Sequence, residues 1–397
     1  MCAYAQVLKY VTMRRSYTIG FDAKHANRGN TTQSNYARFV ISALSEAVPK
    51  SAYFRAYIER SEPNDEYEEL AQRANVESME PDGSFWRKFS SLWRLWHVGR
   101  DMQRGDVELY HALAGVVPCG LARRNIRSVV TVHNLEFLRL RHYFTPLSNL
   151  YRRVMMYTSM CRADRIIAVS EHLKQELVHH FRIDSDKIDV IYGGCHRRFG
   201  ESISNEDVVS VKERYTLPEK YLLVLGAHRA HKNLNLILEA LPKIDPQLKI
   251  VIVGRSTKYT DTLMRRIRSL GVEERVQMVQ GVEREDMPAI YRAATAYLML
   301  SLYEGFATTI VEALTVGTPV IAARGSSLEE TGGEGSIYID PKSSSALVGA
   351  VNSIMQSEEL RERMIEQGKE HAKRFRPEVI AYNILNCYRR IGVDIPL

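Results

Sequence analysis

AYLMLSLYEGFATTIVEALTVGTPVIAA, residues Ala296 to Ala323, combines two apolar runs with a turn and a longer segment between them. Both runs are short and bounded by turn residues, so they predict buried strands, and the turn falls at residues 304–306. A helix is expected from there to about Val316, ended by the glycine and proline of residues 317–319. The order strand, loop, helix, strand is the repeating unit of a parallel sheet.

The expected helix begins near Ala307 and Thr308, where backbone N–H groups and a partial positive charge suit a diphosphate. Gly305 allows a ligand to approach the backbone closely. Glu304 precedes the helix and Glu312 lies about one turn inside it, so a bound phosphate would have a carboxylate on either side. One carboxylate would bond sugar hydroxyls and the other ribose hydroxyls. The alternative, two solvated surface glutamates, is weakened because buried strands bracket the loop.

The same alternation of short apolar runs and amphipathic stretches occurs twice along the chain, which predicts an α/β protein with two Rossmann-like parallel-sheet domains facing each other across a cleft. The expected strands are residues 17–21, 53–58, 107–110, 128–133, 165–169 and 187–191, and then 221–225, 249–253, 275–279, 296–300, 319–322 and 336–339. We expect an N-terminal extension over residues 1–16, domains over 17–195 and 196–376, and a last helix over 377–397 that packs back toward the first domain.

Composition narrows the class of protein. The chain has 397 residues, 45% of them hydrophobic and 25% charged, with a net charge of +7 that favours an anionic partner. No apolar run approaches the roughly 20 residues of a membrane-spanning helix, and residues 1–16 make a poor signal peptide. The five cysteines are scattered, without the spacing of a disulfide framework or a zinc site. A reducing cytoplasm is the expected location.

Glu304-Gly305-Phe306 followed by Glu312-Ala313 resembles the E-x7-E signature of family-4 retaining glycosyltransferases, which implies the GT-B fold. The segment from Gly226 to Leu234 resembles the family's G-x5-K-N-L element, whose basic residues hold the donor diphosphate, and Lys232 and Asn233 align with it. The family often carries Arg directly before that Lys. Here His231 stands there and Arg229 lies two positions earlier, so either could reach the phosphate.

Further resemblances extend over nearly the whole chain from Tyr17. Thr131 to Leu135 is similar to the family's T-x-H-D-L element, with Asn134 in place of Asp, which implies that His133 faces the donor sugar. Val253-Gly254 matches the V-G end of a family strand.

Three weaker elements of the resemblance leave alternatives open. Gly29 lies where the family has a glycine-rich loop near the phosphates, although it could be a simple turn. His111 resembles the end of the family's D-x-x-H strand and could contact the acceptor or only pack. Gly281 and Val282 are expected to contact the nucleotide base through their backbone.

The family's chemistry requires stabilisation of a departing diphosphate, which Arg229, Lys232 and the helix N-terminus can supply without a metal or a cofactor. Asp184-Ser185-Asp186 has the D-x-D form of metal–nucleotide sites, but its polar surroundings predict a solvated turn. The resemblance implies retention of anomeric configuration. Because no residue is a convincing covalent nucleophile, we favour displacement on one face, with leaving-group phosphate oxygens helping to deprotonate the acceptor.

The resemblance to bacterial mannosyltransferases implies transfer of a hexose from a nucleotide sugar, with GDP-mannose favoured over UDP-sugars. The expected acceptor is a saccharide or lipid-linked saccharide, in biosynthesis of lipopolysaccharide, capsule or exopolysaccharide. The alternatives are a GT-B-fold nucleotide-sugar epimerase and a non-catalytic nucleotide-sugar-binding protein. No recognisable motif supports nucleic-acid binding.

The segment SFWRKFSSLWRLWHVGR holds all three tryptophans, Trp86, Trp93 and Trp96, among basic residues. This pattern is typical of a helix on an anionic membrane surface, at the inner face of the cytoplasmic membrane. It is equally typical of a core helix whose basic residues face water, which is the interpretation we favour.

Overall fold

A computed structural model of the protein describes residues 16–29, 31–59, 64–113, 115–226 and 229–397. The expected extension over 1–16 therefore lies outside the described residues except for Ser16. The chain forms two compact units. Unit 1 comprises the chain up to Val169, Leu173–Tyr192 and Pro377–Leu397, and unit 2 comprises Ser170–His172 and Gly193–Arg376.

Unit 1 is built on a parallel sheet that, within the described residues, has the strand order β3-β2-β1-β4-β5-β6-β7. Every pairing in it is parallel, as βα repeats require. The strands are β1 (Tyr17–Asp22), β2 (Ala52–Tyr57), β3 (Val76–Met79), β4 (Leu109–Ala112), β5 (Arg127–Val132), β6 (Arg165–Ala168) and β7 (Ile188–Val190).

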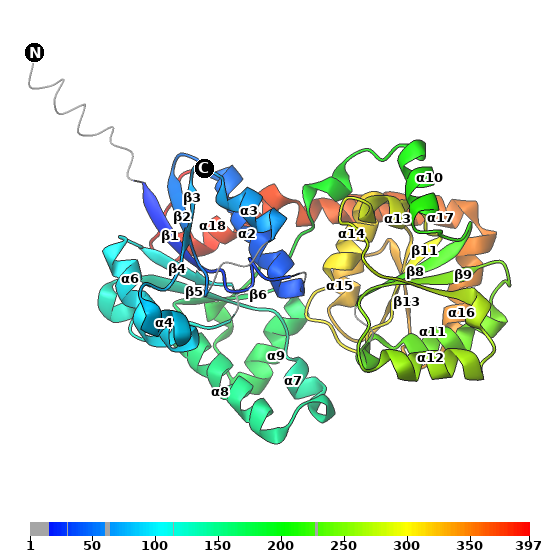
Figure 1. The fold of residues 1–397 in the computed structure, drawn as a ribbon, viewed down its shortest axis with the longest axis horizontal. Coiled ribbons are helices and arrows are strands. Elements are labelled where there is room, and N and C mark those ends of the chain that lie inside the picture. The colour runs from blue at the N-terminus through cyan, green and yellow to red at the C-terminus, as the bar shows by residue number, and fades with distance from the viewer. Residues whose placement is uncertain (1–15, 30, 60–63, 114, 227–228) are drawn as a thin grey trace, which may run out of the picture. The chain divides into compact units, whose positions relative to one another are not determined.

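Helices of unit 1 cover this sheet and include one from the end of the chain. They are α2 (Thr32–Ala47), α3 (Asp65–Ala71), α4 (Ser84–Lys88), α5 (Ser90–Leu92), α6 (Val98–Arg104), α7 (Glu136–Arg139), α8 (Pro146–Arg162), α9 (Glu171–Phe181) and α18 (Pro377–Arg389). The C-terminal α18 packs on α2 and buries Ile380, Ile384 and Tyr388 (Figure 1). Unit 1 is therefore completed by a segment almost 200 residues downstream of its other parts.

Unit 2 repeats the design with the strand order β10-β9-β8-β11-β12-β13, again parallel throughout. Its strands are β8 (Tyr221–Leu225), β9 (Lys249–Val253), β10 (Val276–Val279), β11 (Ala296–Met299), β12 (Val320–Ala323) and β13 (Ser336–Ile339). Its helices are α10 (Asn205–Arg214), α11 (Leu234–Ala240), α12 (Thr260–Ser269), α13 (Met287–Ala293), α14 (Thr308–Val316), α15 (Leu328–Gly332), α16 (Ser344–Gln356) and α17 (Glu358–Ala372).

Two helical layers sandwich the sheet of unit 2 (Figure 1). On one face α11 packs with α12 and α16 over a core that includes Leu222, Ile250 and Leu298. On the other face α14 packs with α13 and α17. The near-continuous burial of β8, β9 and β11 follows from cover on both faces, and it explains why these strands read as unbroken apolar runs. The expected fold class is thus confirmed for the two sheets.

One strand escaped the sequence pattern. β3 is an edge strand of four residues, and its two central residues, Glu77 and Ser78, are exposed. An edge strand covered on one side only needs no apolar run, so hydrophobic periodicity carries little signal there.

The tryptophan segment divides between core and surface. Trp93 is fully buried and donates from its indole nitrogen to the Asp101 carboxylate at 2.7 Å. Arg94 is also buried, and its guanidinium contacts Asp22 at 2.7 Å and Glu59 at 3.3 Å. Trp96 and Phe85, in contrast, are largely exposed. The core interpretation is therefore right for Trp93 and wrong for Phe85 and Trp96, and Arg94 faces neither water nor a membrane.

Two further expectations from the sequence concern the turn at residues 184–186 and helices that could span a membrane. Asp184 accepts a hydrogen bond from the backbone N–H of Asp186 at 2.9 Å, as a turn residue does. Among the described residues, no helix combines the length and the apolar character that crossing a bilayer requires.

Candidate active site

The candidate site of unit 2 lies where the strand order of its sheet reverses. β8 and β11 are neighbours in the sheet. The strand that follows β8 along the chain, β9, lies on one side of this pair, and the strand that follows β11, β12, lies on the other side. In such sheets the loops after the two central strands diverge and leave room for a ligand at the carboxyl edge. Those loops carry the G-x5-K-N-L and E-x7-E residues.

An ion pair joins the two loops. Lys232 Nζ lies 2.7 Å from Glu304 Oε1, and the side chains are 21% and 16% exposed. Burial opposes ionisation of Glu304, but the charge and hydrogen bond of Lys232 outweigh it, so the pKa of this carboxyl is lowered. The Glu304 carboxyl is therefore ionised at neutral pH, and both side chains remain partly open to solvent.

Backbone contacts hold the two loops in place. The Leu302 N–H donates to the His231 carbonyl at 2.9 Å, and the Ser327 hydroxyl donates to the Glu304 carbonyl at 2.9 Å. Because these contacts use main-chain atoms of His231 and Glu304, they fix the position of the ion pair without occupying the Glu304 carboxylate.

His231 and Arg229 are distinguished by burial. His231 is only 8% exposed, and burial, with the nearby Lys232 and Arg229 charges, lowers its pKa, so its ring is neutral. Arg229 is exposed and begins the 3-10 helix Ala230–Lys232. Of the two residues that the sequence left open, Arg229 is the cation available to a phosphate.

Gly226 ends β8 in a conformation that suits glycine, with φ of 115°. A Cβ atom there would lie 3.4 Å from Lys232 Cε, so the lysine side chain passes directly over this position. Ala227 and His228 lie outside the described residues. Gly226 thus allows both the turn and the close approach of Lys232.

Helix α14 lacks a side-chain cap at its N-terminus. Thr31, Ser204 and Ser357 cap other helices through their side chains, but the corresponding residue of α14 is Ala307, which has no polar side-chain atom. The first-turn N–H groups of any helix lack intrahelical acceptors. At Thr308 and the residues after it, these donors follow Glu304 closely along the chain and suit an anion.

Glu312 lies inside α14 and is half-buried. The Tyr291 hydroxyl donates to Glu312 Oε2 at 2.7 Å and also to the Thr309 carbonyl at 3.1 Å. Burial raises the pKa of the Glu312 carboxyl to about 7, although the Tyr291 hydrogen bond and the charges of Arg284 and Arg198 oppose the shift. Glu304 and Glu312 therefore differ in charge state near neutral pH.

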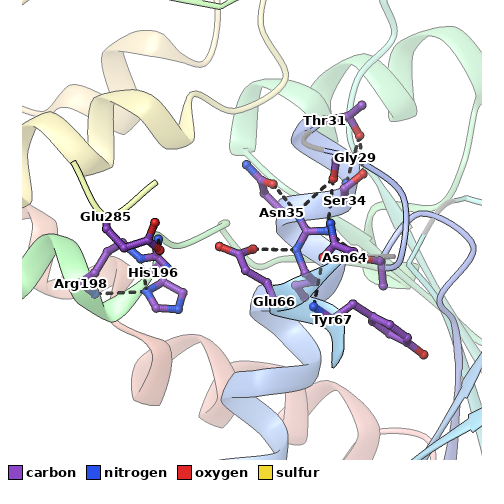
Figure 2. A network of polar contacts seen from close by, with 12 residues as sticks. Gly29, Thr31, Ser34, Asn35, Asn64, Glu66, Tyr67, His196, Arg198 and Glu285 are labelled. Carbon is purple, nitrogen blue, oxygen red and sulfur yellow. Dashed lines mark hydrogen bonds and ion pairs between the residues drawn. The ribbon is translucent and has the colours of Figure 1, made fainter. Parts of the chain in front are cut away.

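Arg198 belongs to a small polar network that Figure 2 shows. Its guanidinium donates to Glu285 Oε1 at 2.8 Å and to His196 Nδ1 at 3.0 Å. The network orients an arginine whose charge acts on Glu312.

Two of the predicted binding residues, Asn233 and Phe306, also make contacts that shape their loops. The Asn233 side chain donates to the Pro341 carbonyl at 2.8 Å, and its backbone adopts φ of 57°, so it shapes the loop between β8 and α11. The Phe306 ring is buried and packs edge-on against Phe375, and a Cβ at Gly193 would lie 3.0 Å from it. Phe306 fixes the turn that presents Gly305 and Ala307.

The remaining predicted residues of unit 2 end two neighbouring strands. The Gly254 N–H donates to the Val279 carbonyl at 3.1 Å, which closes the ends of β9 and β10. Gly281 follows β10 with φ of 67° and is exposed, and Val282 is half-buried. This loop lies at the same carboxyl edge as Lys232, because the strands are parallel.

In unit 1, Gly29 lies in the loop between β1 and α2, with φ of 35°. The buried Arg38 of α2 holds this loop, with contacts to the Ala26 carbonyl at 2.6 Å, the Gly29 carbonyl at 3.3 Å and Glu66 at 3.0 Å. Gly29 and Glu66 are labelled in Figure 2. Gly29 therefore occupies a constrained turn, and nothing lies within 4 Å of a Cβ built on it.

His133 is a neutral histidine with a defined tautomer. Nε2 lies 2.7 Å from the Leu113 carbonyl, which can only accept, so Nε2 carries the proton. Burial lowers the pKa of His133 to about 4, with the Leu113 hydrogen bond acting in the opposite direction. Nδ1 is left as an acceptor, and the ring packs edge-on against Tyr36.

His111 packs in the core of unit 1. It is 0% exposed, and its ring nitrogens lie 2.7 Å from the Tyr388 hydroxyl and 2.7 Å from the Thr131 hydroxyl. Burial lowers its pKa to about 3. Both ring nitrogens are therefore occupied by hydroxyl groups of the protein, which is the packing role that the sequence left open beside acceptor contact. His111 ties α18 to β4 and β5.

Two families of known proteins match the chain over these elements. The model described as Glycosyl transferases group 1 matches residues 209–371, and the model described as Glycosyltransferase Family 4 matches residues 41–198. The first match contains Lys232, Glu304 and Glu312, and the second contains His133. Both models describe glycosyltransferases, and together they match both halves of the chain. The chain is a glycosyltransferase.

Relatives of this glycosyltransferase include O-antigen enzymes. O-antigen chain mannosyltransferase B of Escherichia coli is 25% identical over 274 residues, which cover 68% of this chain and 72% of that protein. O-antigen chain mannosyltransferase RfbU of Salmonella typhimurium is 25% identical over 266 residues, which cover 66% of this chain and 67% of that protein. The structure of Anabaena Alr3699/HepE in complex with UDP-glucose has a TM-score of 0.75 at 19% identity, covering 95% of this chain and 100% of that one. This likeness confirms the GT-B fold.

Three residues that hold predicted site residues in place, one in unit 1 and two in unit 2, were not found from the sequence. Tyr291, Ser327 and Arg38 contact Glu312, Glu304 and the Gly29 loop from 21, 23 and 9 residues away. Tyr291 lies in α13 and Ser327 directly precedes α15, and neither belongs to a motif. Only Arg38, a charged residue on the apolar face of α2, had a local signal, because such a residue needs buried partners.

Proposed function

We propose that this glycosyltransferase moves a mannosyl group from GDP-mannose to a saccharide or lipid-linked saccharide acceptor in the biosynthesis of a cell-surface glycan. The observation that carries the proposal is the Lys232–Glu304 pair, held beside the helix α14 that Ala307 leaves without a side-chain cap. The names of the two O-antigen mannosyltransferase relatives support mannose and the glycan.

In the proposed donor complex, Lys232, Arg229 and the first-turn N–H groups of α14 bind the diphosphate, since all three are positive donors. Glu304 accepts hydrogen bonds from hydroxyls of the hexose. Glu312 accepts hydrogen bonds from the ribose hydroxyls, and the backbone at Gly281 and Val282 contacts the base.

The reaction breaks the bond between the anomeric carbon and the diphosphate oxygen and forms a bond from that carbon to an acceptor oxygen. The electron pair of the broken bond goes to the diphosphate, where the cationic groups stabilise it. The acceptor proton passes to a leaving-group phosphate oxygen. Attack on the face that the diphosphate leaves gives retention, and it requires neither a metal nor a covalent glycosyl-enzyme.

A ligand screen tests the donor. We expect GDP-mannose to raise the melting temperature of the purified protein more than UDP-glucose, UDP-GlcNAc or an ADP-sugar at equal concentration. A ligand at 100 times its Kd adds about 2.7 kcal/mol to the free energy of unfolding. A larger shift with UDP-glucose would contradict mannose and leave glycosyl transfer in place. Conversion of the nucleotide sugar without an acceptor would instead identify an epimerase.

A further inference from the structure

The loop between β10 and α13, residues 280–286, is held by a tyrosine and a buried carboxylate. The Tyr215 hydroxyl accepts a hydrogen bond from the Glu283 N–H at 3.1 Å and donates to Asp286 Oδ2 at 2.7 Å. Arg214 binds both oxygens of the same carboxylate, at 2.9 and 2.7 Å, and Asp286 is only 8% exposed. A bidentate pair of this kind fixes direction as well as distance. The main chain at Glu283 therefore has a defined position in what we call the β10–α13 loop.

The β10–α13 loop lies close to Glu312, which the proposed function assigns to the ribose. The charges of Arg284, in the loop, and of Arg198 oppose the rise in the pKa of Glu312. Arg198 in turn donates to Glu285 of the loop at 2.8 Å (Figure 2). Because the effect of a charge declines with distance, both guanidinium groups lie near the Glu312 carboxyl. A base is joined directly to its ribose, so a ribose bonded to Glu312 carries its base into the surroundings of this loop.

Glu283 differs from the other two acids of the β10–α13 loop in its contacts. Glu285 pairs with Arg198, and Asp286 pairs with Arg214. Among the described residues, no hydrogen bond or ion pair engages the Glu283 carboxylate, and this residue is exposed. Its backbone N–H is nevertheless bonded, as described above. The loop thus presents a carboxylate at a defined position, with both oxygens available to a ligand.

Guanine has an edge that matches a carboxylate. Its N1–H and its exocyclic 2-amino group are adjacent donors, so the two oxygens of one carboxylate can accept from a single base in a charge-assisted pair of hydrogen bonds. Uracil has one N–H on the equivalent edge, between two carbonyl oxygens that a carboxylate repels. Adenine has an unprotonated ring nitrogen there, which is itself an acceptor. A carboxylate beside the base therefore favours guanine over the other two bases.

We propose that Glu283 selects guanine in the donor nucleotide by accepting hydrogen bonds from N1–H and the 2-amino group, and that Tyr215 is the positioning residue that holds Glu283 beside the base. This role of Glu283 rests on the proposed function, in which the backbone at Gly281 and Val282 contacts the base. Backbone N–H and C=O groups can bond to donors and acceptors alike, so they accommodate more than one base. Glu283 supplies the discrimination that those contacts lack.

Calorimetric titration of the full chain with GDP, IDP and UDP tests the role of Glu283. IDP is GDP without the 2-amino group, so the ratio of their dissociation constants isolates one hydrogen bond of the base. We expect the wild type to bind GDP about tenfold more tightly than IDP, as one charge-assisted hydrogen bond allows. In Glu283→Ala the two constants should agree within about twofold, and the affinity for UDP should not fall. The control Glu273→Ala, which removes an exposed glutamate preceding β10, should keep the wild-type ratio.

Tyr215→Phe tests the positioning role. Phenylalanine keeps the ring but lacks the hydroxyl that bonds Glu283 and Asp286. The preference for GDP over IDP should therefore fall to about threefold, and in the Glu283→Ala background the same substitution should have no further effect on this ratio. A purely structural role of Tyr215 would instead weaken GDP and IDP binding equally, and that result would remove Tyr215 from the proposal.

The remaining outcomes separate this proposal from the donor assignment. If GDP binds more tightly than UDP but Glu283→Ala leaves the ratio of GDP to IDP unchanged, Glu283 does not contact the base and GDP-mannose remains the proposed donor. An equal loss of the preference in Glu273→Ala would show a general effect of charge and overturn the role of Glu283. A wild type that binds UDP more tightly than GDP would contradict both. Because Glu283 and Glu273 are exposed, unchanged melting temperatures verify that these variants fold.

Discussion

Lys232 and Glu304 form a pair that is only partly exposed, so each charge depends on the other. Removing one partner would leave the other charge desolvated and uncompensated, which costs more than the pair itself contributes. In the proposed mechanism, a diphosphate competes with Glu304 for Lys232 and frees the carboxylate for sugar hydroxyls. The pair therefore keeps both groups in position before the donor arrives.

Glu304→Gln should separate sugar positioning from nucleotide binding. The amide keeps the size of the side chain but loses its charge, so kcat should fall by about 10²–10³ while the Kd of GDP changes by less than about threefold. Steady-state kinetics and calorimetry give the two values. Glu239→Gln, which removes another carboxylate of unit 2 paired with an arginine, is the control. A variant that transfers sugar at the wild-type rate would refute the role of Glu304.

Glu312→Gln should change how stability depends on pH. The pKa of Glu312 is about 7 in the folded protein, above its ordinary 4.5, so the folded state holds this proton more tightly. Stability is thus unaffected below pH 4.5, falls as the pH rises from 4.5 to 7, and stays reduced above 7. The loss is on the order of 3 kcal/mol, since each pKa unit corresponds to about 1.4 kcal/mol. The amide introduced by Glu312→Gln can still accept the hydrogen bond from the Tyr291 hydroxyl. Because the amide does not ionise, the variant should not lose stability as the pH rises.

Urea unfolding at pH 5 and pH 8 measures this effect as the difference between variant and wild type. That difference should grow in favour of Glu312→Gln as the pH rises, whereas the exposed control Glu206→Gln should show no such trend. A difference that is the same at both pH values would mean that Glu312 is already ionised in the free protein.

Helix α14 combines two features of the proposed donor site. Its N-terminus begins after Ala307, which provides no side-chain cap, and Glu312 lies within the helix. Its other end is fixed by Gly317, whose φ of 92° and N–H bond to the Ala313 carbonyl at 3.0 Å stop the helix before β12. The C-terminus of α14 is therefore capped by Gly317, whereas its N-terminus, which follows Glu304 along the chain, has no side-chain cap.

The substitution Ala307→Ser should give α14 a side-chain cap at its N-terminus. A serine oxygen can accept from the first-turn N–H groups, which raises the free energy of unfolding by about 0.5–1 kcal/mol. The same bond competes with the diphosphate, so the Kd of GDP should rise. Thermal unfolding and calorimetry measure the two changes on one sample. Greater stability with unchanged GDP affinity would show that the nucleotide does not use this helix end.

The whole chain is assembled asymmetrically. Unit 2 is almost one continuous segment with its own core, whereas unit 1 needs α18, which arrives only after unit 2 has been synthesised. His111 and Tyr388 join α18 to the sheet of unit 1 by a buried hydrogen bond of 2.7 Å. The order of folding should follow this connectivity.

Residues 193–376 expressed alone should therefore fold cooperatively and bind GDP within about tenfold of the full chain, because they hold every proposed donor residue of unit 2. Residues 1–192 should not fold alone and should gain structure when a peptide of residues 377–397 is added. Circular dichroism melts and calorimetry test both statements. A folded, stable 1–192 fragment would show that α18 is dispensable for unit 1.

Twelve of the described strands could be predicted from short apolar runs, and the signal is clearest in strands such as β8, β9 and β11, which are covered on both faces. The predicted site residues of unit 2 came from loops at strand ends, where glycine and charge interrupt such runs. β3 could not be found in this way, because an exposed edge strand is not required to be apolar. The exposure of Leu147, Leu150 and Tyr151 on α8 could not be predicted either. Helical spacing shows that apolar residues share one face of a helix, but it does not show whether that face points to the core or to solvent.

Local sequence thus dictated the repeating strand–helix units and the positions of Lys232, Glu304 and Glu312, because turn chemistry and hydrophobic period are short-range properties. Tertiary contacts decided the states of these groups. Lys232 and Glu304 meet across 72 residues, Tyr291 reaches Glu312 across 21, and Tyr388 reaches His111 across 277. The pKa of a carboxyl or an imidazole depends on burial and on charges within a few ångströms, and those neighbours are set by the packing of distant segments.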